Sequence, residues 1–331
     1  MSVVAVAGGS GDLGAIIVEA LFETEKYDVR VLSRKAPAMP FMRISPTTGE
    51  AYLPFVEADY SSEGALVETL SKYKVEVIIC AFGLRNDAAC EAQLQLIRAA
   101  DKAPSVKRFI PSEFNIDYGL GDAVPYPNKR FHLAARKELE KTSLEFSYIY
   151  AGMFMDYYVI PKFPTTIKPL CFFVDPVNSA AVLADDGEAK MSMTLTKDIA
   201  RYTVLALELD KWPKVMTTAP STISLNELVA LFEKHTGHKF QVQYQPVSKL
   251  LEHDSIPLPE NTAIYERSPE RFPNGPQQLQ AVIADLEASV ALGSYDFDRL
   301  EGHLDLVKAF EGKTSPPRRI EDLVKKCWGA K

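Results

Sequence analysis

Short apolar runs alternate with longer amphipathic stretches along the first 150 residues of this 331-residue chain. The runs are rich in β-branched residues and have the length of buried strands. They occupy residues 3–7, 29–32, 55–58, 75–81, 106–110 and 146–150. Between them, residues 13–23, 65–73, 88–102 and 129–141 repeat apolar positions at helical spacing. Apolar strands that alternate with helices predict an α/β fold, a doubly wound parallel sheet with helices on both faces.

The pattern changes after Gly152, where aromatic residues and prolines crowd together. We therefore expect a first domain over residues 1–153 and a smaller, α+β C-terminal lobe over residues 154–331. Because helical spacing returns from about 194 to 235, we expect this segment to pack back on the first domain.

Two helices are predicted inside this second lobe. The stretch 194–207 has a capping residue, either Thr196 or Asp198, near its start. The stretch 225–235 is a second amphipathic helix. Residues 254–276 instead hold many prolines and charges, so we expect a long surface loop, and such loops often border a site.

A glycine motif lies between the first predicted strand and the first predicted helix. Gly8, Gly11 and Gly14 have the spacing GxxGxxG. The first glycine permits a tight turn, the second lets a pyrophosphate approach the backbone, and the third allows close packing of helix and strand. The helix then offers free N–H groups and a positive dipole to the phosphates. This context predicts a Rossmann-type domain that binds a dinucleotide.

The end of the second strand favours NADP(H) over NAD. Proteins that bind NAD usually place an acidic residue there for the adenosine ribose. Here the strand ends in Ser33, followed by Arg34 and Lys35. A guanidinium group pairs well with a 2′-phosphate, which an acidic residue would repel. Asp59, after the third strand, either contacts the adenine amino group or caps the next helix.

Composition restricts the class of partner and the compartment. The formal net charge of −7 argues against nucleic acid or an anionic membrane as a partner. The four cysteines are scattered without metal-binding spacing, which is typical of a reduced intracellular setting. The apolar run formed by the first residues is too short for a signal peptide. We therefore expect a cytoplasmic protein with no bound metal.

Four stretches together carry a resemblance to a known family. They are GGSGDLG at 8–14, KRFIPSEF at 107–114, SYIYAGMF at 147–154, and Thr194 with Asp198 and Ile199. Over about residues 1–235 the chain resembles the NmrA-like family of atypical short-chain dehydrogenases. It is most similar to the branch of isoflavone reductase and phenylcoumaran benzylic ether reductase. The resemblance implies an NADP-dependent reductase with a small aromatic or phenolic substrate bound between two lobes.

The resemblance also implies which residues line the cofactor. The expected residues along the cofactor are Gly8, Ser10, Gly11, Leu13, Gly14, Arg34, Ala81, Phe82 and Gly83. We also expect Asp12 in the glycine turn and Lys35 beside Arg34 to contact the cofactor. Those expected near the nicotinamide are Pro111, Ser112, Glu113 and Phe114.

The chain departs from that branch at one position. The reductases carry a lysine sixteen residues before the tyrosine that matches Tyr148, and here this position is His132. His132 either replaces the lysine as proton donor and acceptor, or packs without a catalytic role. Alternatively Lys129, one helical turn earlier, reaches into the site, or reductase chemistry has been lost. The usual Tyr-x-x-x-Lys pair is not assigned to Tyr126, because the residue four positions after it is Arg130.

Aromatic residues after the last strand of the first domain are candidates for a substrate wall. Ligands of open α/β sheets bind beyond the carboxyl ends of the strands. Met153, Phe154, Tyr157 and Tyr158 follow such an end. They either form an apolar wall for an aromatic substrate or pack the two lobes together. We expect a monomer or homodimer.

Three functions remain open at this stage. The first is an NADPH-dependent reductase of a carbonyl, imine, activated alkene or benzylic ether, with His132 or Lys129 handling the proton. The second is a redox sensor of the NmrA type, which binds dinucleotides without turnover. The third is a nonredox enzyme on the same fold.

Overall fold

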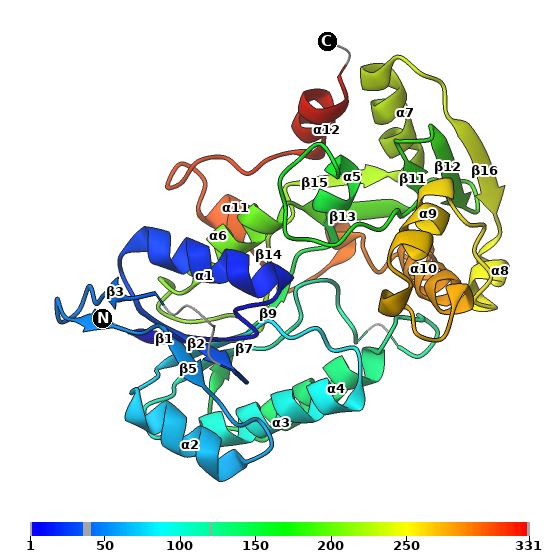
Figure 1. Ribbon diagram of the computed structural model, residues 1–331. Helices are drawn as coiled ribbons and strands as arrows, with labels where there is room; N and C mark the ends of the chain where they lie inside the picture. Colours follow the sequence, from blue (N-terminus) through cyan, green and yellow to red (C-terminus); the bar gives the residue numbers. More distant parts are fainter. Residues whose placement is uncertain (1, 36–40, 120, 330–331) are drawn as a thin grey trace.

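A six-stranded parallel sheet forms the centre of the first half of the chain. The computed structural model describes residues 2–35, 41–119 and 121–329 (Figure 1). The strand order is β5 (Phe55–Glu57), β2 (Asp28–Ser33), β1 (Val3–Ala7), β6 (Val77–Cys80), β7 (Arg108–Ile110) and β8 (Glu145–Phe146), and all pairs are parallel. The chain starts in the middle, builds one edge and then returns to build the other. This is the Rossmann arrangement that the alternating pattern predicts.

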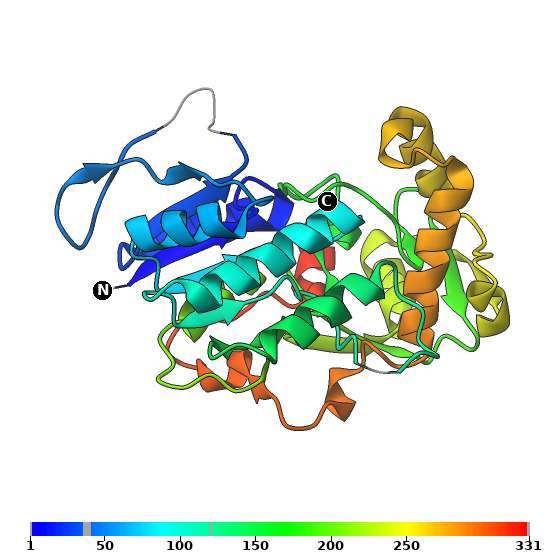
Figure 2. The same cartoon turned by 90° about the horizontal axis from the view of Figure 1, so that it is seen from below.

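Helices cover both faces of this sheet. One face carries α1 (Asp12–Thr24) and α6 (Thr196–Ala206), and the other carries α2 (Glu63–Lys72), α3 (Asp87–Lys102) and α4 (Lys129–Leu139) (Figures 1 and 2). In β1, alternate residues belong to different cores. Val4 and Val6 pack with α1 and α6, whereas Ala5 and Ala7 pack with the helices of the other face. Burial on both faces explains why the run is apolar throughout.

The second half of the chain contributes to the first domain. Helix α6 lies on the same face of the sheet as α1, where Ile199 and Ala200 join Ile16 and Ile17 in one core. Beyond β8, a smaller parallel sheet consists of β9 (Tyr148–Tyr150), β14 (Val215–Thr217) and β17 (Leu304–Asp305). The sequence indicated one strand at 146–150. The structure has two, because β9 pairs with β14 instead of continuing along β7.

The remaining residues form a lobe at the carboxyl ends of the parallel strands (Figure 1). Its two sheets are β10 (Met153–Phe154), β13 (Lys190–Thr194) and β15 (Ser221–Ser224), and β11 (Val174–Asp175), β12 (Ala180–Ala184) and β16 (Gln241–Gln245). The other elements in this half are α5 (Asp156–Val159), α7 (Leu225–Thr236), α8 (Val247–Leu251), α9 (Pro259–Arg267), η1 (Pro269–Arg271), α10 (Pro276–Ala291), η2 (Phe297–Arg299), α11 (Leu306–Ala309) and α12 (Ile320–Trp328). A short hairpin, β3 (Arg43–Ile44) and β4 (Ala51–Tyr52), lies beside β2.

Two local expectations need correction. The segment 254–276 is not a continuous loop, because it contains α9 and η1. Asn261 on α9 is buried, and its amide bonds both the backbone N–H and the carbonyl of Cys171. Helix α6 begins at Thr196, but neither Thr196 nor Asp198 caps it: Leu195 precedes the helix, and the Thr196 N–H is bonded by Asp156, forty residues earlier in the chain. Sequence periodicity near 194 carries no sign of so distant a cap.

The described ranges also bear on membrane crossing, disulfides and metal binding. No helix there is both long enough and apolar enough to span a bilayer. The four cysteines are free thiols. No group of three His, Cys, Asp or Glu side chains converges on a metal-sized space in these ranges.

Candidate functional site

The glycine turn after β1 is wound tightly on itself. Gly8 has φ of +80°, a conformation that side chains with a Cβ rarely adopt. The Gly11 N–H donates to the Gly8 carbonyl at 2.9 Å. A Cβ on Gly14 would lie 2.1 Å from that same carbonyl oxygen, which is far inside contact distance. The turn therefore requires glycine at both Gly8 and Gly14.

Above this turn, the amino end of α1 is open. Gly11 is the residue before the helix, and no side chain of the described residues caps it. Among those residues, a Cβ on Gly11 would meet only the Gly8 oxygen, at 3.2 Å. Ser10 is exposed, and Asp12 and Leu13 are half-buried. Free N–H groups, a helix dipole and an unobstructed approach fit a pyrophosphate group.

The end of β2 presents two cations to solvent. Arg34 and Lys35 are both exposed, and the Ser33 hydroxyl donates to the Lys35 carbonyl at 2.8 Å. Asp59 accepts hydrogen bonds from the Ser61 side chain and N–H, which lower the pKa of its carboxyl. The residue that caps α2 is Ser62, so the capping alternative for Asp59 is wrong. An exposed guanidinium group at this strand end has the chemistry that pairs with a phosphate.

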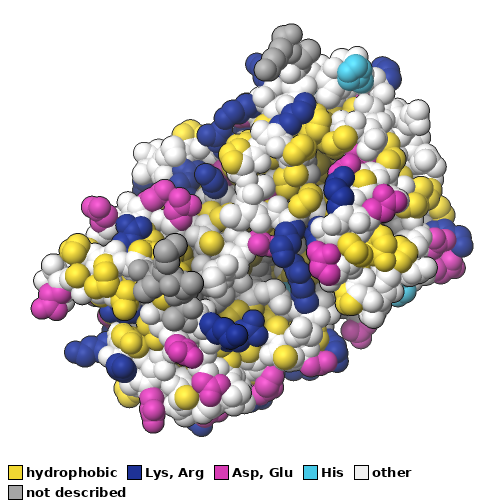
Figure 3. Space-filling model, in the orientation of Figure 1, with side chains coloured by type: hydrophobic (Ala, Val, Ile, Leu, Met, Phe, Trp, Pro, Cys, Tyr) yellow, Lys and Arg dark blue, Asp and Glu magenta, His cyan; other side chains and the backbone are white. Residues whose placement is uncertain are grey.

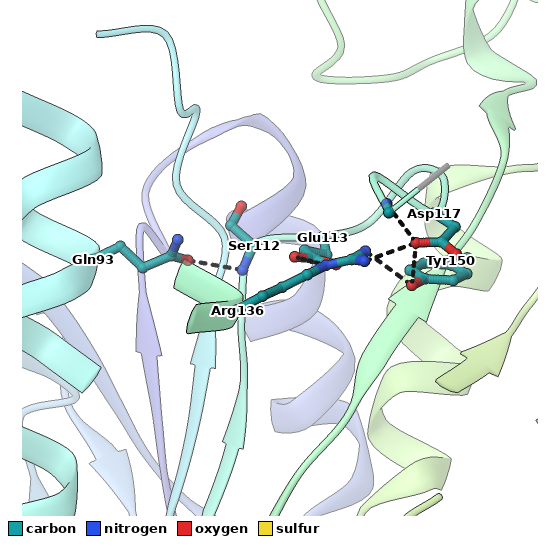
Figure 4. A network of polar contacts seen from close by, with 7 residues as sticks. Gln93, Ser112, Glu113, Asp117, Arg136 and Tyr150 are labelled. Atoms are coloured by element: carbon teal, nitrogen blue, oxygen red, sulfur yellow. Dashed lines mark hydrogen bonds and ion pairs between the residues drawn. The ribbon is translucent and has the colours of Figure 1, made fainter. Parts of the chain in front are cut away.

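The ends of β1, β6 and β7 are linked by direct contacts. A Cβ on Gly8 would lie 2.7 Å from the Ala81 oxygen and 3.1 Å from the Phe82 ring, so the residues after β6 lie against the turn. Gly83 is exposed. The Ser112 hydroxyl donates to the Phe82 carbonyl at 2.7 Å, and Gln93 accepts from the Ser112 N–H (Figure 4). The expected cofactor residues after β1, β6 and β7 therefore lie along one continuous edge.

A buried ion pair fixes the loop after β7. Arg136 on α4 donates from Nε and Nη2 to the two oxygens of Glu113, at 2.6–2.9 Å (Figure 4). Its other contacts are Asp117 at 2.7 Å and the Tyr150 hydroxyl at 2.9 Å. Burial raises the pKa of Glu113 to about 7, although Arg136 opposes this shift. Since both carboxylate oxygens are bound to Arg136, Glu113 braces the loop against α4 and β9.

The flanks of this loop are buried. Pro111 is buried, and Phe114 packs into the core shared with α1 and α6. The ion pair itself was missed at the sequence level. The one available signal was that Arg136 shares a helical stripe with His132 and Lys129.

His132 is buried and neutral. It is 8% exposed, and its ring stacks on Tyr118 with centroids 3.7 Å apart. Burial lowers the pKa of His132 to about 3, with Arg136 adding to the effect. Its Nδ1 has no hydrogen-bond partner within the described ranges. The ring is therefore uncharged at neutral pH and holds no imidazolium proton to give away.

Lys129 is tied to the loop that precedes α4. Its Nζ donates to the Gly121 carbonyl and, at 3.2 Å, to the Val124 carbonyl. These bonds hold the ammonium at the start of the helix, one turn before His132. The two candidate proton carriers therefore differ in environment: His132 stacks on an aromatic ring, whereas Lys129 is bonded to backbone carbonyls.

The four candidate substrate residues divide into two pairs. Met153 and Tyr158 are buried in the core of the second lobe, where the Tyr158 hydroxyl contacts the Met191 sulfur. Phe154 and Tyr157 are half-buried and stack with ring centroids 6.2 Å apart. Figure 3 shows a hollow between the two halves of this face, with Lys and Arg side chains along it. Only Phe154 and Tyr157 retain surface for contact with a ligand.

Comparison with known proteins agrees with this architecture. The model of the NmrA-like family matches residues 1–288. Among curated relatives, the oxidoreductase swnN of Metarhizium robertsii is 30% identical over 80% of this chain and 83% of its own. Bifunctional pinoresinol-lariciresinol reductase 1 of Linum usitatissimum is 32% identical over 72% of this chain and 76% of its own.

Solved structures show the same fold over nearly the whole chain. Leucoanthocyanidin reductase from Vitis vinifera superposes with a TM-score of 0.70 at 18% identity, covering 98% of each chain. AtPrR2, solved with NADP+ and (+)-pinoresinol, superposes with a TM-score of 0.71 at 21% identity and the same coverage. Because the family model covers most of its length, this chain belongs to the NmrA-like family.

Proposed function

We propose that the protein is an NADPH-dependent reductase of a small aromatic or phenolic molecule. The open amino end of α1, framed by a turn that tolerates no side chain at Gly8 or Gly14, carries the proposal. Relatives named as oxidoreductases and reductases support it.

The residues fit the two ends of the cofactor. The N–H groups after Gly11 would hold the pyrophosphate, and Arg34 would pair with the 2′-phosphate. The residues Ala81 to Gly83 and the 111–114 loop would border the nicotinamide. When bound, the reduced nicotinamide supplies hydride. The chain's own contribution is to position the reacting carbon and to exclude water around it.

The substrate would lie against Phe154 and Tyr157. Their stacked rings offer an apolar face suited to another aromatic ring. A structural relative is solved with pinoresinol, a phenolic molecule, which supports this class. The reducible group would be a carbonyl, imine, activated alkene or benzylic ether.

Nucleotide binding and turnover are tested on the same preparation. Calorimetric titration should show tighter binding of NADPH than of NADH. With a panel of aromatic ketones, imines and phenolic ethers, absorbance at the reduced-nicotinamide band should fall when a panel compound that is a substrate is added. Arg34→Ala should weaken NADPH binding about 10–100-fold, because a charge-assisted bond contributes about 1.5–3 kcal/mol. NADH affinity should not change. Wild-type protein that binds neither nucleotide would overturn the proposal.

A dinucleotide sensor is the second candidate. The observation that favours it is the surroundings of the two expected proton carriers, since His132 is neutral and Lys129 is bonded to loop carbonyls. A sensor would bind NADPH tightly and leave every panel compound unreduced.

A further inference from the structure

Three phenols and one amide form a polar cluster beside His132. We call Asn115, Tyr118, Tyr126 and Tyr295 the tyrosine cluster. Tyr118 and Tyr126 meet edge to face at 4.9 Å, and the Tyr126 ring also meets the edge of His132 at 6.4 Å. The Asn115 Oδ1 and the Tyr295 hydroxyl are buried and lack a hydrogen-bond partner within the described ranges. Unpaired buried polar atoms are costly, so this cluster calls for a functional explanation.

Tyr126 is the least buried tyrosine of the cluster. Tyr118 and Tyr295 are buried, whereas Tyr126 is half-buried. The Asn115 Nδ2 donates to the Tyr126 oxygen at 2.6 Å. The oxygen therefore acts as an acceptor in this bond, and the hydroxyls of Tyr118 and Tyr295 are its other polar neighbours. This phenol is held in place among groups with which it can exchange a proton.

The cluster lies between the proposed nicotinamide end and the proposed substrate wall. Phe82 contacts the glycine turn and accepts a hydrogen bond from Ser112. The Ser112 backbone in turn hydrogen-bonds the His132 ring. The edge of that ring meets Tyr126. On its other side, Tyr126 is near enough to Tyr157 to raise the pKa of the Tyr157 phenol. A substrate between Tyr157 and the nicotinamide would thus meet the Tyr126 hydroxyl.

We propose that Tyr126 is the proton donor of the reduction, oriented by the Asn115 amide. This inference rests on the proposed reductase function. For a carbonyl substrate, the carbon receives hydride from the reduced nicotinamide, and the electron pair of the C=O double bond moves to oxygen. That oxygen takes the Tyr126 proton, and the resulting phenolate regains a proton from water. One NADPH and one proton are consumed, and an alcohol and NADP+ are formed.

The surroundings of Tyr126 suit this step better than those of the two basic candidates. The Asn115 Nδ2 donor stabilises negative charge on the oxygen as the proton leaves. Burial raises the pKa of Tyr126, and the hydroxyls of Tyr118 and Tyr295 partly offset that rise. The phenol is therefore protonated at neutral pH. His132 contributes a neutral ring that supports Tyr118 and Tyr126 from one side.

Tyr126→Phe tests the proposal because it removes only the hydroxyl. With a panel compound that the wild type reduces, we expect kcat to fall by about 100-fold or more, the usual contribution of a general acid. Calorimetry should show NADPH affinity within about twofold of the wild type, and circular dichroism should show a native fold. Tyr244→Phe, at an exposed tyrosine on β16, is the matched control and should leave kcat unchanged.

The outcomes separate this inference from the proposed function. A Tyr126→Phe variant with wild-type kcat overturns the inference and leaves the reductase function standing. The inference is also overturned if kcat falls about 100-fold in His132→Asn and does not fall in Tyr126→Phe. A wild type that binds NADPH but reduces no panel compound overturns the reductase function and the inference together.

Discussion

At the scale of single residues, Gly11 and Gly14 have different neighbours, so their substitution should separate folding from nucleotide binding. Gly14→Ala would place a Cβ 2.1 Å from the Gly8 oxygen, and we expect a loss of about 2 kcal/mol or more in unfolding free energy. Gly11→Ala meets that oxygen at 3.2 Å, at an ordinary negative φ. It should retain stability within about 1 kcal/mol but lose NADPH binding, because its methyl group occupies the pyrophosphate path. Urea unfolding and calorimetry measure the two effects.

If Gly11→Ala binds NADPH as tightly as the wild type, the phosphates do not lie over this turn. A matched substitution at Gly64, where an added Cβ meets no atom of the described residues within 4 Å, controls for the general effect of replacing a helical glycine by alanine. It should bind NADPH normally.

The buried histidine should make the protein sensitive to acid. The pKa of His132 is about 3 in the folded state and about 6.5 when the chain is unfolded, so the unfolded state binds a proton first. Its contribution to stability is complete above pH 6.5 and is lost as the pH falls toward 3. We expect the unfolding free energy of His132→Asn to fall less steeply than that of the wild type in this window. His238→Asn, at an exposed histidine, should keep the wild-type slope.

At the scale of elements, a buried carboxyl on α10 connects three segments of the second lobe. Glu287 Oε2 accepts from the Ser255 hydroxyl at 2.7 Å and from the Gln245 amide on β16 at 2.9 Å. Burial raises the pKa of Glu287 to about 8, so the folded state holds this proton over a range where the unfolded chain has released it. Stability from this group is complete below pH 4.5 and is lost as the pH rises through 8.

Glu287→Gln should therefore flatten the alkaline side of the stability profile. The amide keeps the shape and an acceptor oxygen but carries no charge. At pH 8 to 9 we expect the variant to be more stable than the wild type by about 1–3 kcal/mol. Denaturant unfolding across pH 5 to 9 measures this, with the exposed Glu266→Gln as control. An unchanged slope would show that the folded protein ionises Glu287 at its usual pKa.

Elements with a strong local pattern were predictable, and contacts between distant elements were not. The six parallel strands, α1 to α4 and the glycine turn follow from periodicity and glycine spacing. The Asp156 bond to the start of α6 and the Glu113–Arg136 pair join residues 40 and 23 positions apart. The direction of the Lys129 side chain depends on the fold of the 121–124 loop, which no periodicity encodes. For the same reason, the sequence left the proton carrier open.

At the scale of the whole molecule, the two halves share one hydrophobic core. Ile199, Ala200 and Tyr202 of α6 are at most 1% exposed and pack in the same cluster as Ile16 and Ile17 of α1. One face of the nucleotide-binding sheet is thus completed by residues some 180 positions further along the chain. The sheet that carries the proposed cofactor site therefore depends on the second half of the chain for part of its hydrophobic core.

This interlocking predicts that the first domain does not fold alone. A fragment of residues 1–153 would expose the face of β1 and α1 that α6 covers, and each large aliphatic side chain left in water costs about 1.5–3 kcal/mol. Since native domains are stable by only about 5–15 kcal/mol, we expect the fragment to lack a cooperative unfolding transition and to bind a hydrophobic dye. The intact chain should unfold in one transition that NADPH shifts upward, by about 2.7 kcal/mol at a concentration of 100 Kd. A fragment that unfolds cooperatively and binds NADPH would show instead that α6 only covers a domain already stable without it.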